Sequence, residues 1–268
     1  MKDAFVGVDV AFAKGKRLPV VVCTKQAGRL VPLLLRTLPE AFPPRGRGNR
    51  IALDDKGVHS FAQETLGYLR AIEKTHMIRI VRVAIDAPSC YKREGTSRRA
   101  AELAMDQRRI SCFATPSQAE FEKIRSKAQR HLDEGGPESH MPHANQLWML
   151  VGFALFEVLN KHYECIEVFP QAIAHALRAR TIHKSSSEGM ALQLAAVARH
   201  SGWPLKEENL SLSKVAFGSL QDKLDAYLSA WVASLSRKEC HPCGEPPSDV
   251  IWIPRCRGNS HLNLKNAS

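Results

Sequence analysis

The sequence lacks any long uninterrupted run of apolar residues. Its most apolar segment, Leu147 to Leu159 (LWMLVGFALFEVL), contains Glu157 and is shorter than the roughly 18 residues that a membrane-spanning helix needs. The N-terminus, MKDAFVGVDV, carries Asp3 and Asp9 and lacks the long apolar core and small-residue cleavage site of a signal peptide. We therefore expect an intracellular, cytoplasmic protein with no membrane partner.

The sequence also lacks a recognisable cysteine framework. Its seven cysteines are odd in number and irregularly spaced, which suits reduced thiols better than disulfides. Cys240 and Cys243 form a C-x-x-C pair, and Cys256 downstream is a candidate third zinc ligand. Because a second C-x-x-C is missing, we expect residues 237–249 to form a loop with free thiols rather than a zinc site.

Several catalytic signatures are missing as well. The chain contains no P-loop and no Gly-x-Ser-x-Gly motif, so neither P-loop nucleotide binding nor α/β-hydrolase chemistry is expected. Gly-rich phosphate loops of the kind used by actin-like nucleotide enzymes are also missing, which disfavours that class. No internal repeat or low-complexity tract is present.

Acidic residues are outnumbered by basic ones. The chain of 268 residues holds 38 Lys and Arg against 27 Asp and Glu, which gives a formal net charge of +11. Such a surface favours an anionic partner, above all nucleic acid. Seven basic residues follow Asp86 on two expected helices, where they could track a phosphate backbone or simply form solvated helix faces: Arg98, Arg99, Arg108, Arg109, Arg125, Lys127 and Arg130.

Apolar and β-branched runs predict strands at both ends of the chain. Three closely spaced runs predict an antiparallel meander at Phe5–Val10, Leu18–Thr24 and Gly28–Leu35. Pro32 makes the third of these an edge strand. Further strands are expected at Ile78–Asp86, Tyr163–Pro170 and Val250–Pro254.

Helical periodicity fills most of the remaining chain. We expect helices near residues 59–73, 96–109, 117–131, 145–161, 171–180, 188–200 and 219–235. Strands followed by helices indicate an α/β fold. We expect one domain over residues 1–254, with a helical insertion at about 92–161, and a polar tail at 255–268.

Carboxylates at strand ends are the main candidates for a functional site. Asp9 and Asp86 close two expected strands, and Glu167 lies near the end of a third. Asp225 lies on the last long helix, one turn after Asp222. A strand-end Asp is usually a cap or turn residue. However, ligand sites in open α/β sheets gather at carboxyl strand ends, so Asp9 and Asp86 should converge if their strands are neighbours.

A cluster of acids is costly unless a cation relieves the repulsion. Hard carboxylate oxygens select Mg²⁺ or Mn²⁺, which often also bind substrate phosphates. Two such ions can activate water and stabilise the leaving oxygen during phosphodiester cleavage. A basic surface around an acidic pocket would suit a polyanionic substrate.

An ordered series of motifs resembles the family of predicted RNase H-like nucleases. The series is FVGVDVAF, VAIDAP, RAAEL with FATPSQ, IEVFP, KLDAYLSAW and VIWIP, and it covers about Phe5 to Pro254. The resemblance implies a ribonuclease H-like α/β fold, with a mixed five-stranded sheet flanked by helices. It also implies metal sites at Asp9, Asp86 and Asp225, with Glu167 as a further candidate.

The D-x-x-D-A pattern of the last helix is also similar to Holliday-junction resolvases of the same superfamily, and this similarity adds Asp222. The sequence therefore predicts a metal-dependent nuclease that acts on DNA or RNA, with Mg²⁺ or Mn²⁺ as cofactor. The alternative is a non-catalytic protein that binds nucleic acid or another partner on the same fold.

Overall fold

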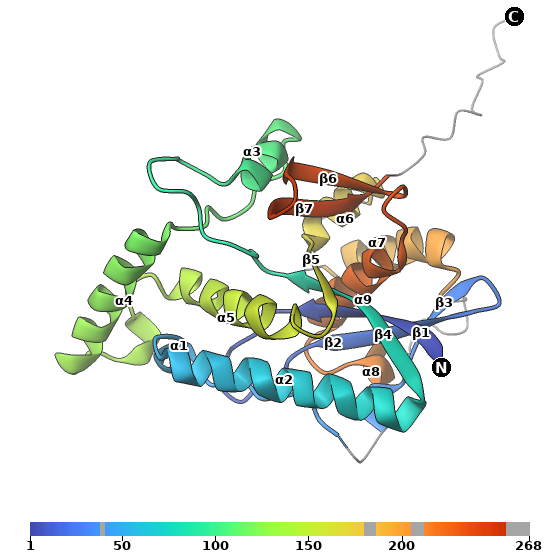
Figure 1. Ribbon diagram of the computed structural model, residues 1–268, viewed down its shortest axis with the longest axis horizontal. Helices are drawn as coiled ribbons and strands as arrows, with labels where there is room; N and C mark the ends of the chain where they lie inside the picture. The colour runs from blue at the N-terminus through green and yellow to red at the C-terminus, as the bar shows by residue number, and fades with distance from the viewer. Residues whose placement is uncertain (38–40, 180–185, 205–211, 256–268) are drawn as a thin grey trace, which may run out of the picture.

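A mixed sheet lies at the centre of the protein (Figure 1). The computed structural model describes residues 1–37, 41–179, 186–204 and 212–255. In these ranges seven strands pair in the order β3-β2-β1-β4-β5-β7-β6. Their bounds are β1 Lys2–Asp9, β2 Val20–Gln26, β3 Arg29–Pro32, β4 Ile78–Asp86, β5 Glu164–Glu167, β6 Cys240–Glu245 and β7 Asp249–Pro254.

The expected meander and the parallel strands meet at β1. Strands β1, β2 and β3 are antiparallel neighbours, and β3 with Pro32 is an edge strand, which confirms both predictions. On its other side β1 pairs in parallel with β4, β4 with β5, and β5 with β7. The α/β class is therefore confirmed.

The expected number of strands was wrong. The described residues form seven strands, because β7 and β6 extend the sheet beyond β5. Residues 237–249, expected as a loop, contain β6, which pairs antiparallel with β7. Its sequence, CHPCGE, includes the strand-depleted residues Pro and Gly, but Pro is tolerated in an edge strand such as this one.

Helices cover both faces of the sheet (Figure 1). The first three are α1 (Asn49–Ala52), α2 (Asp55–His76) and α3 (Ala100–Gln107), followed by α4 (Gln118–Asp133) and α5 (Ala144–Leu159). The last four are α6 (Pro170–Ala176), α7 (Ser187–Ser201), α8 (Leu212–Val215) and α9 (Leu220–Ser234). Single 3₁₀ turns form at Leu35–Thr37 and Glu138–His140. None of the helices in the described ranges is long and apolar enough to cross a membrane.

Successive side chains of β1 point to opposite faces of the sheet and contribute to two separate hydrophobic cores. Val6 and Val8 point into a core with the apolar faces of α2 and α5. Phe5, on the opposite face, packs against a second core to which α9 contributes most of its length. Helices α3, α4 and α5 all lie between β4 and β5 in the chain, where the helical insertion was expected.

Capping side chains set where the long helices begin. Asp54 accepts hydrogen bonds from the backbone N–H groups of Lys56 and Gly57, both at 3.1 Å, so α2 begins four residues before the expected start. Ser117 and Glu120 form a capping box at the start of α4. Ser219 and Asp222 form another at the start of α9. Each box satisfies N–H groups that the helix itself leaves unpaired.

Helix α9 lies directly against the backbone of β1. A Cβ placed on Gly7 would lie 2.0 Å from the carbonyl oxygen of Ala226 and 2.4 Å from the amide nitrogen of Ala230. Both neighbours are backbone atoms, so no side chain can rotate away. The packing of α9 on the central strand therefore requires glycine at position 7.

We expect Gly7→Ala to destabilise the fold by about 3 kcal/mol or more, since overpacking against rigid atoms forces the backbone to shift. Urea denaturation followed by circular dichroism would measure this. The matched control is Gly67→Ala on α2, where nothing lies within 4 Å. There the change should stabilise by about 0.5–1 kcal/mol, because alanine favours a helix interior. Equal stability of the two variants would contradict the close packing.

Candidate active site at the carboxyl ends of the central strands

Asp9 and Asp86 lie side by side at one edge of the sheet. They are the last residues of β1 and β4 and are partners in the parallel register. Neighbouring strands are about 4.8 Å apart. Gly7 and Ala84, each two residues earlier, face α9. Because side chains alternate along a strand, these register partners lie on the same face of the sheet. We call these two residues the strand-end acid pair.

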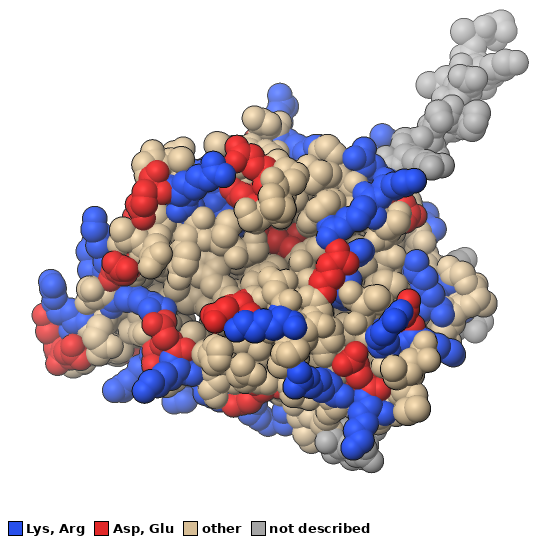
Figure 2. Space-filling model, viewed as in Figure 1, with Lys and Arg blue, Asp and Glu red and all other residues tan. Residues whose placement is uncertain are grey.

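The strand-end acid pair lines a pocket of about 310 Å³, here called the acid pocket. Its other polar lining includes Arg99, Glu102 and Glu167, and its apolar lining includes Phe113, Trp148, Met149, Phe169 and Ile251. On the face of the molecule that Figure 2 shows, a hollow has acidic atoms at its floor and uncharged side chains beside it. The volume is within the range of small-molecule sites. The pocket lies where ligand sites of α/β sheets gather.

Helix α9 brings Asp225 toward the same edge. The first turn of α9 lies beside Pro19: a Cβ placed on Gly218 would lie 2.9 Å from the Pro19 side chain and 3.0 Å from that of Asp222. Pro19 in turn accepts a hydrogen bond from the amide of Asp9 at 3.2 Å. Asp225, 7% exposed, lies between this start and the contact with Gly7. It is buried near the end of β1 but does not line the acid pocket.

Asp222 has a different position. Its carboxylate accepts a hydrogen bond from the amide of Ser219 at 2.8 Å and so closes the capping box of α9. It does not line the acid pocket. The i, i+3 spacing that suggested a shared site thus places Asp222 at the helix start and Asp225 one turn further along.

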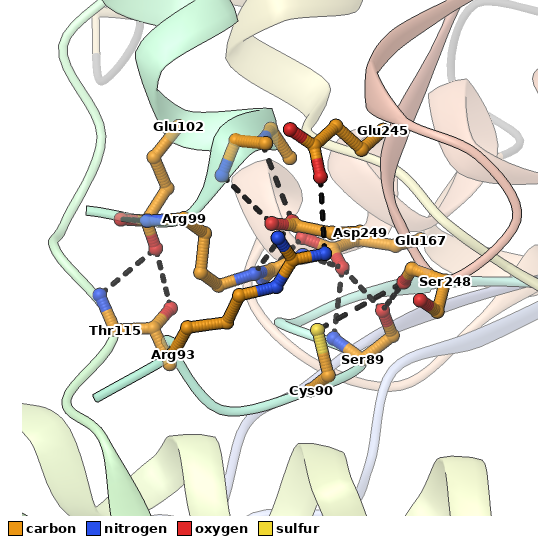
Figure 3. A network of polar contacts seen from close by, with 12 residues as sticks. Ser89, Cys90, Arg93, Arg99, Glu102, Thr115, Glu167, Glu245, Ser248 and Asp249 are labelled. Atoms are coloured by element: carbon orange, nitrogen blue, oxygen red, sulfur yellow. Dashed lines mark hydrogen bonds and ion pairs between the residues drawn. The ribbon is translucent and has the colours of Figure 1, made fainter. Parts of the chain in front are cut away.

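Glu167 lines the acid pocket, but its carboxylate is held by an arginine (Figure 3). Arg99 donates to both oxygens of Glu167, at 2.9 and 2.7 Å. The amide and hydroxyl of Ser89 donate to Oε2 at 2.8 and 2.7 Å. Ser89 follows Asp86 by three residues, so Glu167 fixes the loop that leaves the acidic end of β4.

Arg99 is the centre of a buried ionic cluster. Its side chain is 1% exposed, and its Nε donates to Asp249 at 3.0 Å. Asp249 also accepts from the amide of Ala100 at 2.7 Å. Burial is the largest single influence and disfavours the charge on Arg99, but the attraction and hydrogen bonds of Glu167, together with Cys90 and Asp249, outweigh it, so the pKa of Arg99 is raised. The cluster joins the start of α3 to the end of β5 and the start of β7.

Glu102 extends the cluster toward the loop before α4. One oxygen accepts hydrogen bonds from the amide and hydroxyl of Thr115, at 2.8 and 2.5 Å. Burial raises the pKa of Glu102 despite these bonds. Sequence analysis did not single out Glu102 or Asp249. The RAAEL motif, which contains Arg99 and Glu102, was the one signal for part of this cluster.

Both interpretations of Arg99, as a phosphate contact and as part of a solvated helix face, were wrong. Its guanidinium is buried in ion pairs, which charge patterning in a sequence cannot distinguish from a solvated helix face. Arg98 pairs with Asp106 at 2.8 Å, and Arg125 pairs with Asp55. Arg99 therefore serves the fold, whereas Arg98 and Arg125 form ion pairs nearer the surface.

The residues of the acid pocket fit a cation only in part. Two adjacent carboxylates are a suitable donor set for Mg²⁺ or Mn²⁺, which take one or two carboxylates and complete their shell with water and substrate phosphates. Across residues 1–37, 41–179, 186–204 and 212–255, no group of three or more His, Cys, Asp or Glu side chains could hold a metal ion. Within those ranges the strand-end acid pair is therefore a set of two carboxylates that is not part of any larger ligand group.

The C-x-x-C pair lies on β6 rather than in a loop. Cys240 and Cys243 are both buried. Burial raises the pKa of the Cys240 thiol to about 11 and also raises that of Cys243, so both remain protonated near neutral pH. Metal ligation requires the thiolate form. Cys256, the candidate third ligand, lies outside the described residues.

A second pocket adjoins the acid pocket and shares Thr115 with it. Its volume is about 360 Å³, and its basic lining consists of Lys92, Lys123, Lys127 and His143. Glu120 also lines it but pairs with Lys92 at 3.1 Å. Lys123 and Lys127 lie one turn apart on α4 and are exposed. We call this the lysine pocket.

Fold and site together define an α/β protein with an acidic pocket at the carboxyl ends of its central parallel strands. The chain belongs to the family described as Protein of unknown function (DUF429), whose model matches residues 7–249. No curated protein and no solved structure matches the chain.

We expect Arg99→Met to destabilise the protein by about 3–5 kcal/mol, because it leaves Glu167 and Asp249 buried without their counter-charge. Guanidinium denaturation would measure the loss. The control is Arg79→Met, whose partner Asp3 is 49% exposed and whose removal should cost at most about 1 kcal/mol. A similar loss in both variants would show that the buried cluster contributes no more than a surface pair.

Proposed function

We propose that the protein is a metal-dependent nuclease whose acid pocket hydrolyses phosphodiester bonds. The observation that carries this proposal is the pairing of Asp9 with Asp86 at the ends of adjacent parallel strands, inside one pocket. Two carboxylates held this close repel each other, and a divalent cation relieves that repulsion. Mg²⁺ and Mn²⁺ suit such oxygen donors and bind substrate phosphates as well.

The strand-end acid pair would hold the cation. Asp225 would add a third carboxylate nearby, buried on α9 near the end of β1. When bound, the cation would supply a Lewis acid for the scissile phosphate and lower the pKa of a coordinated water. The strand pairing fixes the backbone positions of Asp9 and Asp86 relative to each other, so their spacing is set before substrate arrives. Glu167 acts as a positioning residue, because its oxygens are engaged by Arg99 and Ser89.

The lysine pocket supports nucleic acid as the substrate. It shares Thr115 with the acid pocket, so a polyanion whose scissile phosphate lies at the acids can place neighbouring phosphates among its lysines. The exposed aromatic ring of Phe113 and the half-buried Trp148 line the acid pocket. Aromatic rings beside a basic groove are typical of proteins that bind single-stranded nucleic acid.

The fold proposed here is RNase H-like. In this proposal the strands β3, β2, β1, β4 and β5 form the RNase H-like part of the sheet, and β7 and β6 are added at one side. The ordered motif series and the acids at the ends of β1 and β4 support it.

Asp9→Asn and Asp86→Asn should each abolish cleavage, because each removes a negative ligand of the cation. The assay uses labelled single-stranded, double-stranded, hybrid and branched substrates with Mg²⁺ or Mn²⁺. The control is Asp3→Asn at the opposite end of β1, which should cleave as the wild type does. Circular dichroism would verify that all three variants are folded.

A second readout separates metal binding from catalysis. Saturating Mn²⁺ should raise the wild-type Tm, since a ligand bound only to the folded state stabilises it. That rise should vanish in Asp9→Asn. If the protein binds nucleic acid but neither cleaves it nor responds to metal, the non-catalytic binding protein is favoured instead. The observation behind this alternative is that the described ranges contain no group of three or more metal ligands.

The lysine pocket has its own test. Lys123→Gln combined with Lys127→Gln should weaken oligonucleotide binding and reduce the slope of log K against log salt by about 1.4, because each single-strand phosphate that a lysine neutralises contributes about 0.7 to that slope. Lys2→Gln combined with Lys74→Gln makes the same charge change at exposed residues, at the start of β1 and in the last turn of α2, and should leave the slope unchanged. Equal slopes in the two double variants would refute the proposed backbone path.

A further inference from the structure

A third pocket lies near the β6–β7 hairpin, and the charged residues that line it are all basic. Its volume is about 470 Å³, and Arg108, His175, His241 and Arg255 line it together with Ile110 and Ile253. The four basic residues come from the end of α3, from α6, from β6 and from the residue after β7. Four separate elements therefore bring these side chains together. We call this the arginine–histidine pocket.

Its two arginines lie beside cysteines of β6. The Nε of Arg255 donates to the carbonyl oxygen of Cys240 at 2.7 Å. The guanidinium of Arg108 lies near the side chain of Cys243, where it counteracts the rise that burial causes in the pKa of that thiol. Both cysteines belong to the strand that also carries His241. Neither neighbour neutralises the positive charge.

The electrostatics of the pocket favour an anion. Among the described residues that line it, none is acidic. Partial burial lowers the pKa of His241, and the charges of Arg108 and Arg255 lower it further. Like charges held together repel one another, and a bound anion would remove that cost. Arginine forks match the geometry of phosphate oxygens, and histidine ring nitrogens can donate as well.

We propose that the arginine–histidine pocket is a phosphate-binding site. This inference does not depend on the proposed nuclease function, because binding there requires neither the strand-end acid pair nor a metal. The phosphate can belong to a nucleic acid backbone or to a small phosphorylated ligand.

The fold relates this site to the acid pocket. Ile251 lines the acid pocket, and Ile253, two residues further along β7, lines the arginine–histidine pocket. Both isoleucines belong to one small core with Ile110 and Ala172. The chain from Ile110 to Phe113 likewise runs from one pocket to the other. A nucleic acid strand bound at the acids could therefore also contact this site.

The test follows the histidine imidazole NMR signals of the full chain in EDTA. Titration with inorganic phosphate should shift the His175 and His241 signals and raise the pKa of His241. Arg108→Gln combined with Arg255→Gln should weaken phosphate binding about tenfold or more, given the usual strength of charge-assisted hydrogen bonds. Arg108→Lys keeps the charge and should weaken binding less. Arg199→Gln, exposed on α7, is the matched control and should have no effect.

A short oligonucleotide forms the second arm of the titration. Tighter binding of the oligonucleotide than of inorganic phosphate, abolished in the double arginine variant, would identify the backbone as the source. Tighter binding of a mononucleotide would identify a small ligand. Unchanged imidazole signals in the wild type, or equal phosphate affinity in wild type and double variant with both folded, would overturn the proposal. None of these results depends on cleavage.

Discussion

The structure around the candidate site depends on one buried cation, the guanidinium of Arg99. It binds Glu167 at the end of β5 and Asp249 at the start of β7, two strands that share little direct pairing in the sheet. Through Glu167 it also orders Ser89, just after Asp86. A buried ion pair contributes little net stability compared with apolar packing, but it strongly penalises arrangements that leave one partner alone. Arg99 therefore selects one geometry for the walls of the acid pocket.

Much of the fold could be predicted because its strongest signals are local. The β-branched run Ile78–Asp86 matches β4 at both ends, and the meander required only short breaks between three apolar runs. Strand β6 escaped prediction because Pro242 and Gly244 contradict strand propensity, and pairing with β7 at the sheet edge outweighs it. Its existence depends on a neighbour rather than on its own sequence.

The candidate site likewise has some residues with a local sequence signal and others whose role depends on distant partners. Asp9 and Asp86 could be named from strand ends, but their proximity follows from the parallel pairing of β1 with β4, which are far apart in the sequence. The role of Arg99 could not be predicted, because its partners are 68 and 150 residues distant. A basic residue in a basic protein carries no local sign that it is buried. Asp222 and Asp225 share a motif but lie in different surroundings, one closing a helix cap and the other buried.

The positions of the two acids on strands, rather than on loops, have an evolutionary consequence. The separation of Asp9 and Asp86 is set by the hydrogen-bond ladder of the central sheet. The segment from Pro88 to Thr115, by contrast, supplies much of the remaining lining from loops and a short helix. Loops tolerate substitution and insertion more readily than the strands they connect. Relatives of this chain could therefore diversify in ligand preference while the spacing of the strand-end acid pair stays constant.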